Sequence, residues 1–126
     1  MKILGIDYGR NKMGLAIAEG PLARPLKVFR YKDSTIVAEQ IQRIIKDEGV
    51  EKVVIGVSEG EMGKESKNFS TNFAKMLNVP VETFDETLST QDAQRMSKEA
   101  GIKQKRRHLM EDAYAAAIML QNFLDY

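Results

Sequence analysis

A dense apolar run near the N-terminus, residues 3–6, ends in the carboxylate of Asp7. Apolar residues at this density, without helical spacing, predict a buried β-strand. Gly9 and Gly14 follow, and glycine permits either a tight turn or the close approach of a ligand backbone or phosphate. A turn that only joins two strands explains the stretch equally well, because Asp and Gly are common turn residues. The stretch therefore predicts a strand, and Asp7 at its end is either a functional residue or a residue of the turn.

Five segments of the sequence are strand-like. They cover residues 2–8, 13–18, 26–31, 53–57 and 79–84. The first three follow one another through short connections and predict an antiparallel meander. Residues 53–57 form a continuous apolar run, which is typical of a strand covered on both faces. Because crossovers between parallel strands are right-handed, we expect this strand to lie beside the first one.

Helical spacing of apolar residues separates and follows these strands. One helix is expected from Ser34 to Gly49, where glycine stops it. A loop at residues 58–63 should precede a second helix, whose apolar positions are Phe69, Phe73, Met76 and Leu77. Two more helices are expected, at residues 89–100 and from about His108 onward. The order of elements predicts an α/β fold, a mixed sheet with helices on its faces.

Composition limits the classes of protein that fit this chain. Its 126 residues suit one domain, residues 1–126, and 43% hydrophobic residues supply a core. The net charge of +1 gives no overall attraction to nucleic acid, so any such attraction must be local. The absence of cysteine excludes disulfides and thiolate metal sites, and the single histidine, His108, disfavours a histidine metal site. Without a signal peptide or an apolar run near the roughly 20 residues that span a bilayer, we expect a cytoplasmic protein.

Acidic residues occur at three notable points: the ends of two predicted strands and the border of an apolar helical stripe. Asp7 ends the first strand, Asp85 and Glu86 follow the last one, and Asp112 borders the apolar stripe of the last helix. A carboxylate facing a core costs several kcal/mol unless it is paired or binds a metal. A single such acid is more often the partner of a Lys or Arg. If the acids converge, their oxygens suit Mg²⁺ or Mn²⁺, and two such ions can support phosphodiester cleavage.

Basic residues lie near these acids in the sequence. Arg10 and Lys12 follow Asp7, and a second cluster precedes Asp112: Lys98, Lys103, Lys105, Arg106 and Arg107. A nuclease needs such cations to hold phosphates beside an acidic centre, although a solvated loop explains the cluster as well. Ser89 and Thr90 offer hydroxyls at a helix N-terminus, where phosphate also binds, and capping is the alternative role of Ser89.

Four stretches, residues 7–14, 55–57, 85–90 and 112–116, together resemble the YqgF family. This family is also called RuvX, the pre-16S rRNA nucleases or Holliday-junction-resolvase-like proteins, and the resemblance covers nearly the whole chain. It implies an RNase H-like fold with a five-stranded mixed sheet. It also implies a Mg²⁺- or Mn²⁺-dependent nuclease, monomeric or homodimeric, that processes the 5′ end of pre-16S rRNA or resolves branched DNA. By this resemblance Asp7, Glu86 and Asp112 bind the metal, with Asp85 as a further catalytic candidate.

The chain departs from the family pattern at several positions. Thr87 stands where an arginine is usual, Ser58 where a proline is usual, and Asn11 where a basic residue is common. The missing arginine weakens the phosphate contact that the family would supply and leaves the acids unchanged. Glu59 and Glu61 follow the strand expected beside the first one, so either is an alternative second acid.

Two other functions compete with the nuclease. A catalytically silent nucleic-acid-binding or ribosome-maturation module would share the fold, because a fold does not guarantee activity. The first motif also resembles the phosphate-binding turn of actin-like and sugar-kinase ATPases, which need two such domains around the nucleotide. Binding of Mg²⁺ or Mn²⁺ distinguishes the nuclease from the silent module.

Overall fold

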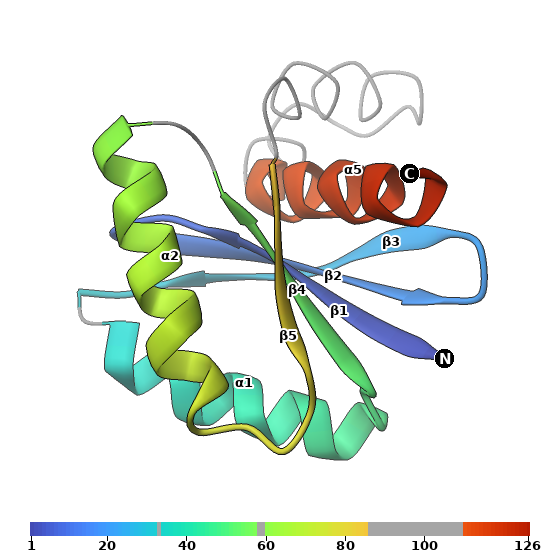
Figure 1. Ribbon diagram of the computed structural model, residues 1–126, viewed down its shortest axis with the longest axis horizontal. Coiled ribbons are helices and arrows are strands. Elements are labelled where there is room, and N and C mark those ends of the chain that lie inside the picture. Colours follow the sequence, from blue (N-terminus) through green and yellow to red (C-terminus); the bar gives the residue numbers. More distant parts are fainter. Residues whose placement is uncertain (33, 58–59, 86–109) are drawn as a thin grey trace.

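The computed structural model describes residues 1–32, 34–57, 60–85 and 110–126, and within these five strands form one mixed sheet (Figure 1). The strands are β1 (Lys2–Tyr8), β2 (Lys12–Glu19), β3 (Ala23–Arg30), β4 (Lys52–Val57) and β5 (Val81–Asp85). Their spatial order is β3-β2-β1-β4-β5. β1 to β3 pair antiparallel, whereas β4 is parallel to β1 and β5 is parallel to β4. The predicted meander with two added parallel strands is confirmed.

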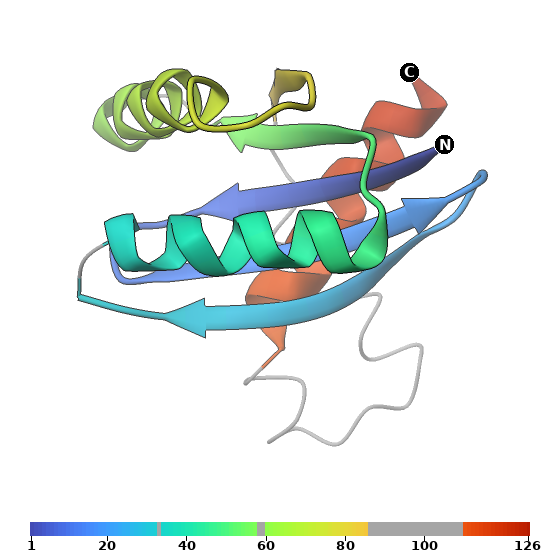
Figure 2. The ribbon, with the colours of Figure 1, turned by 90° about the horizontal axis from the view of Figure 1, so that it is seen from below.

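The helices of the described residues lie on both faces of the sheet. They are α1 (Ser34–Glu48), α2 (Gly60–Ala74) and α5 (Glu111–Asp125). α1 and α2 cover one face, and α5 crosses the other, as the two views show (Figures 1 and 2). Leu4 and Ile6 pack in the α1/α2 layer, while Ile3 packs against α5. Successive β1 residues therefore enter different layers, as strand geometry requires.

Small residues line the sheet where it meets α5. A Cβ atom built on Gly5 would lie 3.0 Å from the Leu120 Cβ atom, and one on Gly14 would lie 1.9 Å from the Asp112 carbonyl oxygen. No side chain fits at Gly14 unless backbone moves. The residues of α5 that face the sheet include alanines, of which Ala113 is fully buried. Glycine at these positions thus lets α5 approach the sheet more closely than larger residues would allow.

α2 differs from the predicted helix at both ends. It begins at Gly60, inside the segment predicted as a loop, and it ends at Ala74, before Met76 and Leu77. Its middle part turns small side chains inward, since Ser66 and Ser70 are buried. These residues pack a helix without giving the apolar period that predicts one.

Other boundaries shift by a few residues. β3 begins at Ala23 and includes Pro25, where the ladder with β2 has an irregularity between Leu15 and Ala16. Proline is tolerated there because β3 is an edge strand. α5 begins at Glu111 rather than near His108, and the helix expected at residues 89–100 lies outside the described residues. No helix in the described part of the chain is both long and apolar enough to cross a membrane.

Candidate active site at the ends of β1 and α5

Asp7 lies near the carboxyl end of β1, the central strand of the sheet. Its Cα partners on the neighbouring strands are Gly14 of β2 and Gly56 of β4, so no side chain flanks it directly. Strand alternation places it on the same face as Ile3, which packs in the α5 layer. The side chain is partly buried. Asp7 is therefore found where the sequence predicted it, near the end of a central strand and between two glycines of the neighbouring strands.

Asp112 reaches the same region from the opposite end of the chain. It is the second residue of α5, and its carbonyl oxygen lies directly against Gly14, the Cα partner of Asp7. The structure thus brings the first turn of α5 to the strand pair that carries Asp7. Glu111 and Asp112 both stand in this first turn, where the helix dipole stabilises negative charge.

Lys12 forms an ion pair with Asp112 across this junction. The Lys12 Nζ atom lies 3.3 Å from the Asp112 Oδ2 atom, with 52% and 21% of the two side chains exposed. A pair of this exposure contributes about 0–1 kcal/mol to folding. Two residues predicted for different roles, a phosphate contact and a metal ligand, therefore contact each other. The pair also shows that a positive charge is accommodated beside this carboxylate.

Tyr31 holds the turn between β1 and β2, a contact that sequence reasoning missed. Its backbone N–H donates to the Asn11 carbonyl oxygen at 2.9 Å. Its hydroxyl donates to the Gly9 carbonyl oxygen and lies 3.2 Å from the Lys12 carbonyl oxygen. Burial raises the pKa of Tyr31 above its usual value, and the nearby Tyr8 and Asp7 raise it further. The Tyr31 hydroxyl therefore stays protonated, and it continues to hold the turn that precedes Lys12.

Asp85 does not join Asp7 and Asp112. It is the last residue of β5, is exposed, and has Val57 as its Cα partner. Val81, four residues earlier on the same strand, packs in the α1/α2 layer. Alternation along β5 places Asp85 on that face too, opposite the face of Asp7. Glu86, the main candidate for the second acid, lies outside the described residues.

The other predicted site residues divide into two groups. Arg10 points to the α2 side, where its Nε atom donates to the Glu65 carboxylate at 2.9 Å, and Glu61 stands in the first turn of α2. Several lie outside the described residues: Glu59, Ser89, Thr90, Lys98, Lys103, Lys105, Arg106 and Arg107. Within the part of the chain that the structure describes, no group of three or more metal-ligating side chains is assembled. The described residues supply two of the predicted three acids, Asp7 and Asp112.

A five-stranded mixed sheet in the order β3-β2-β1-β4-β5, with helices on both faces, has the fold of RNase H-like resolvases. The fold matches T. thermophilus RuvC in complex with a Holliday junction substrate, with a TM-score of 0.63, 17% identity and 94% and 91% of the two chains covered. It also matches the Fowlpox virus resolvase in complex with Holliday junction DNA, with a TM-score of 0.64, 16% identity and 99% and 97% covered.

The sequence identifies the family within this class. Residues 1–126 match the family described as RuvX: Holliday junction resolvase. A relative from Anaeromyxobacter sp., named "Putative pre-16S rRNA nuclease", is 36% identical over 133 residues, covering 99% of this chain and 97% of its own. This chain belongs to the RuvX family, as the sequence motifs predicted.

Proposed function

We propose that this chain is a metal-dependent endonuclease, a single domain over residues 1–126, that cleaves structured RNA during ribosome maturation. The observation that carries the proposal is the contact between Gly14 and α5. It brings Asp112 to the strand pair of Asp7, although the two acids come from opposite ends of the chain. Because Gly14 has no side chain, the first turn of α5, which carries Asp112, lies directly against the strand that pairs with Asp7.

The donor set fits a divalent cation. Asp7 and Asp112 offer oxygen ligands, and the Lys12 ammonium already balances one of these carboxylates. Oxygen ligands without His or Cys suit Mg²⁺ or Mn²⁺. We propose Asp7 as the first ligand and Asp112 as the third, with Glu86 as the second by family resemblance. When bound, such ions supply an activated water and stabilise the leaving oxygen in phosphodiester hydrolysis.

The protein's own residues would position the substrate. Lys12 begins β2 beside Asp112, directly after the turn that Tyr31 holds, so its ammonium would be able to balance a scissile phosphate if it were released from Asp112. The basic residues at 103–107 precede the helix of Asp112 in the sequence and are proposed to hold flanking phosphates.

Pre-16S rRNA is the substrate that we favour over four-way DNA. The relative of 36% identity that bears the rRNA nuclease name aligns over nearly its whole length. The junction-bound resolvases share only 17% and 16% of residues with this chain and support the fold alone. Ribosomal RNA matures where ribosomes are assembled, so we propose that the protein acts in the cytoplasm, as a monomer or homodimer.

The test compares two labelled substrates under the same conditions. One is an RNA carrying the 5′ flank of the small-subunit rRNA, and the other is a four-way DNA junction. Each is incubated with the protein in Mg²⁺, Mn²⁺ or chelator, alongside Asp7→Asn. We expect metal-dependent cleavage of the RNA that Asp7→Asn abolishes. Cleavage of the junction alone would reassign the substrate, and cleavage at the wild-type rate by Asp7→Asn would remove Asp7 from the site.

A second function, a silent nucleic-acid-binding module, is favoured by one observation. Lys12 already satisfies Asp112, so the described acids do not require a metal for stability. A silent module would bind RNA without cleaving it and would show no change in melting temperature with Mn²⁺. A nuclease would be stabilised by Mn²⁺, because a ligand that binds only the folded state raises its stability.

A further inference from the structure

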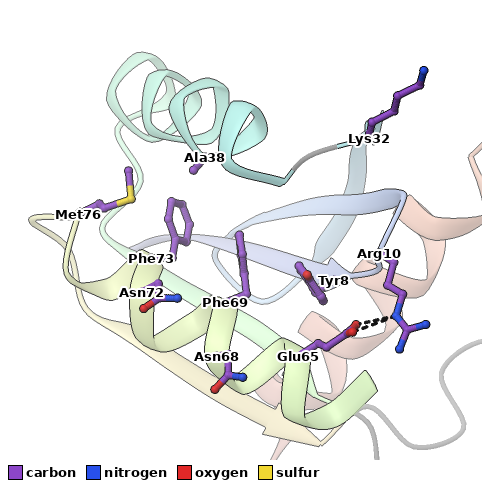
Figure 3. A pocket seen from close by; sticks show the side chains of 10 residues that line it. All are labelled: Tyr8, Arg10, Lys32, Ala38, Glu65, Asn68, Phe69, Asn72, Phe73 and Met76. Atoms are coloured by element: carbon purple, nitrogen blue, oxygen red, sulfur yellow. Dashed lines mark hydrogen bonds and ion pairs between the residues drawn. The ribbon is translucent and has the colours of Figure 1, made fainter. Parts of the chain in front are cut away.

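A pocket of about 420 Å³ opens on the face of the sheet opposite the acids, between α1, α2 and the end of β1 (Figure 3). Of the predicted catalytic residues that the structure describes, none lines it. Its lining includes residues of α1 and α2, Tyr8 of β1 and Arg10 of the β1–β2 turn, which is already predicted to contact nucleic acid. The volume lies within the range of small-molecule sites, about 300–1,000 Å³.

Three aromatic rings form one wall of this pocket. Tyr8 and Phe69 are stacked with their centroids 4.8 Å apart and their planes 29° apart. Phe69 and Phe73 continue the stack at 5.2 Å, again with planes 29° apart. Figure 3 shows Ala38 of α1 across from the rings, and an alanine there leaves space that a larger residue would fill. A flat apolar group can extend a stack of this kind.

Polar groups surround the aromatic wall. Asn68 and Asn72, one turn apart on α2, line the pocket and are exposed. Side-chain amides offer both donors and acceptors, which match the edges of nucleobases. Glu65 balances Arg10 at 2.9 Å, so the pocket centre suits a neutral group better than a phosphate. Lys32, exposed at the rim, adds the positive charge that a flanking phosphate would meet.

The pocket is joined to the acids through the backbone of β1. Asp7 and Tyr8 are consecutive residues of one strand and therefore project to opposite faces. A strand of nucleic acid that crosses the carboxyl end of β1 can reach both faces within a short distance. The two sites thus both lie at the carboxyl end of β1, on opposite faces of the sheet.

We propose that this pocket binds an unpaired nucleobase of a single-stranded segment, which packs against the partly exposed rings of Tyr8 and Phe69, while Phe73, 1% exposed, supports them from the core. The proposal rests on the proposed function for its ligand class, since the base would flank the cleaved bond. Base-aromatic stacking is the usual means by which proteins hold single strands without reading their sequence.

The test measures equilibrium binding in chelator, so that cleavage plays no part. Fluorescence anisotropy compares a labelled single-stranded oligoribonucleotide with an abasic strand of the same length and charge. The wild-type protein should prefer the strand with bases by roughly 5- to 150-fold, the range for losing one stacked base. Phe69→Leu should remove most of this preference, and Phe69→Tyr should retain it.

Phe123→Leu is the matched control, because Phe123 is a partly buried aromatic on the opposite face that pairs with Phe84. It should leave the preference intact. Asn72→Ala, an exposed change, should reduce the preference even if Phe69→Leu fails to fold. Equal binding of both strands by the wild-type protein overturns the proposal, as does full competition by a free nucleoside monophosphate at the oligonucleotide's concentration. Because no step needs cleavage, the outcome is independent of whether the chain is a nuclease.

Discussion

Lys12 and Asp112 pair across 3.3 Å and join the turn after β1 to the first turn of α5. The pair has two consequences for a site built on Asp112. It lowers the free-energy cost of the partly buried Asp112 carboxylate in the metal-free protein. It also places a competing cation where a divalent ion would bind. Metal binding and the ion pair are therefore coupled, and changes at either residue test that coupling.

Lys12→Gln should strengthen metal binding while costing little stability. Removing a half-exposed pair should cost no more than about 1 kcal/mol without metal. With the competing ammonium gone, the rise in melting temperature on adding Mn²⁺ should exceed that of the wild type. Melting curves in chelator and in Mn²⁺ measure both effects. Lys52→Gln is the matched control, because Lys52 pairs with Glu82 at 2.6 Å on the parallel part of the sheet. An unchanged response to Mn²⁺ in Lys12→Gln would separate the pair from the metal.

Asp112→Asn should lower cleavage far more than it lowers stability. Losing one metal ligand should cost at least ~100-fold in rate, since even an outer-shell partner costs ~10–100-fold. The lost ion pair and dipole interaction should cost no more than about 2 kcal/mol together. Asp125→Asn at the other end of α5 should leave cleavage unchanged. A metal-independent loss of ~3–5 kcal/mol in urea unfolding would instead identify a structural ion pair.

Asp85→Asn and Glu86→Gln should differ, although the two residues are adjacent. Asp85 lies on the face opposite Asp7, so its change should leave both cleavage and stabilisation by Mn²⁺ near wild type. Glu86 is the second ligand by family resemblance, so its change should reduce both. Rates and melting temperatures of the two variants give the comparison directly. Equal loss in both would show that Asp85 contributes to the site.

Gly14→Ala should disturb the site as well as the fold. The new Cβ atom would meet the Asp112 carbonyl oxygen, which belongs to backbone and cannot rotate away. Overpacking of this kind costs about 1–3 kcal/mol and should displace the first turn of α5. Gly20→Ala is the control, because Gly20 has a φ of 82° and no atom within 4 Å of its Cβ position. It should lose about 1–2 kcal/mol through backbone strain and keep full activity relative to the folded protein.

Tyr31→Phe should change how stability depends on alkaline pH. The pKa of Tyr31 is raised in the folded protein above the usual value of about 10, so folding favours its protonated form. The resulting stability is fully present below about pH 10 and is lost as the pH rises toward the folded pKa. Tyr31→Phe lacks this titration, so its urea midpoint should fall less steeply above about pH 10 than that of the wild type. Parallel slopes in the two proteins would assign the alkaline loss to other groups.

Strand order and the first acid could be predicted because they depend on local pattern. The apolar run at residues 53–57 has no polar face, so it must lie inside the sheet, and Asp7 ends the strand beside it. The face of Asp85 could not be predicted, because it depends on which residue ends β5. One residue of register moves a side chain to the other side of a sheet.

Contacts between distant residues were also beyond sequence reasoning. Nothing in the sequence near Lys12 indicates Asp112 as its partner, and Arg10 pairs with Glu65 on the other face despite lying only two residues from Lys12. The early start of α2 was missed because its buried positions Gly63, Ser66 and Ser70 carry either no side chain or a small polar one, and so give no apolar period. Such features follow from packing, which local propensity does not determine.

The contact of α5 with β1 and β2 sets an order of events during synthesis. Chains fold from the N-terminus as they are made. The whole sheet precedes α5 in the chain, so its Gly- and Ala-lined face stays uncovered until translation has passed Asp112. A nascent chain consequently carries Asp7 without its partner acid. If the proposed activity is correct, a nascent chain cannot cleave RNA before α5 has packed on the sheet.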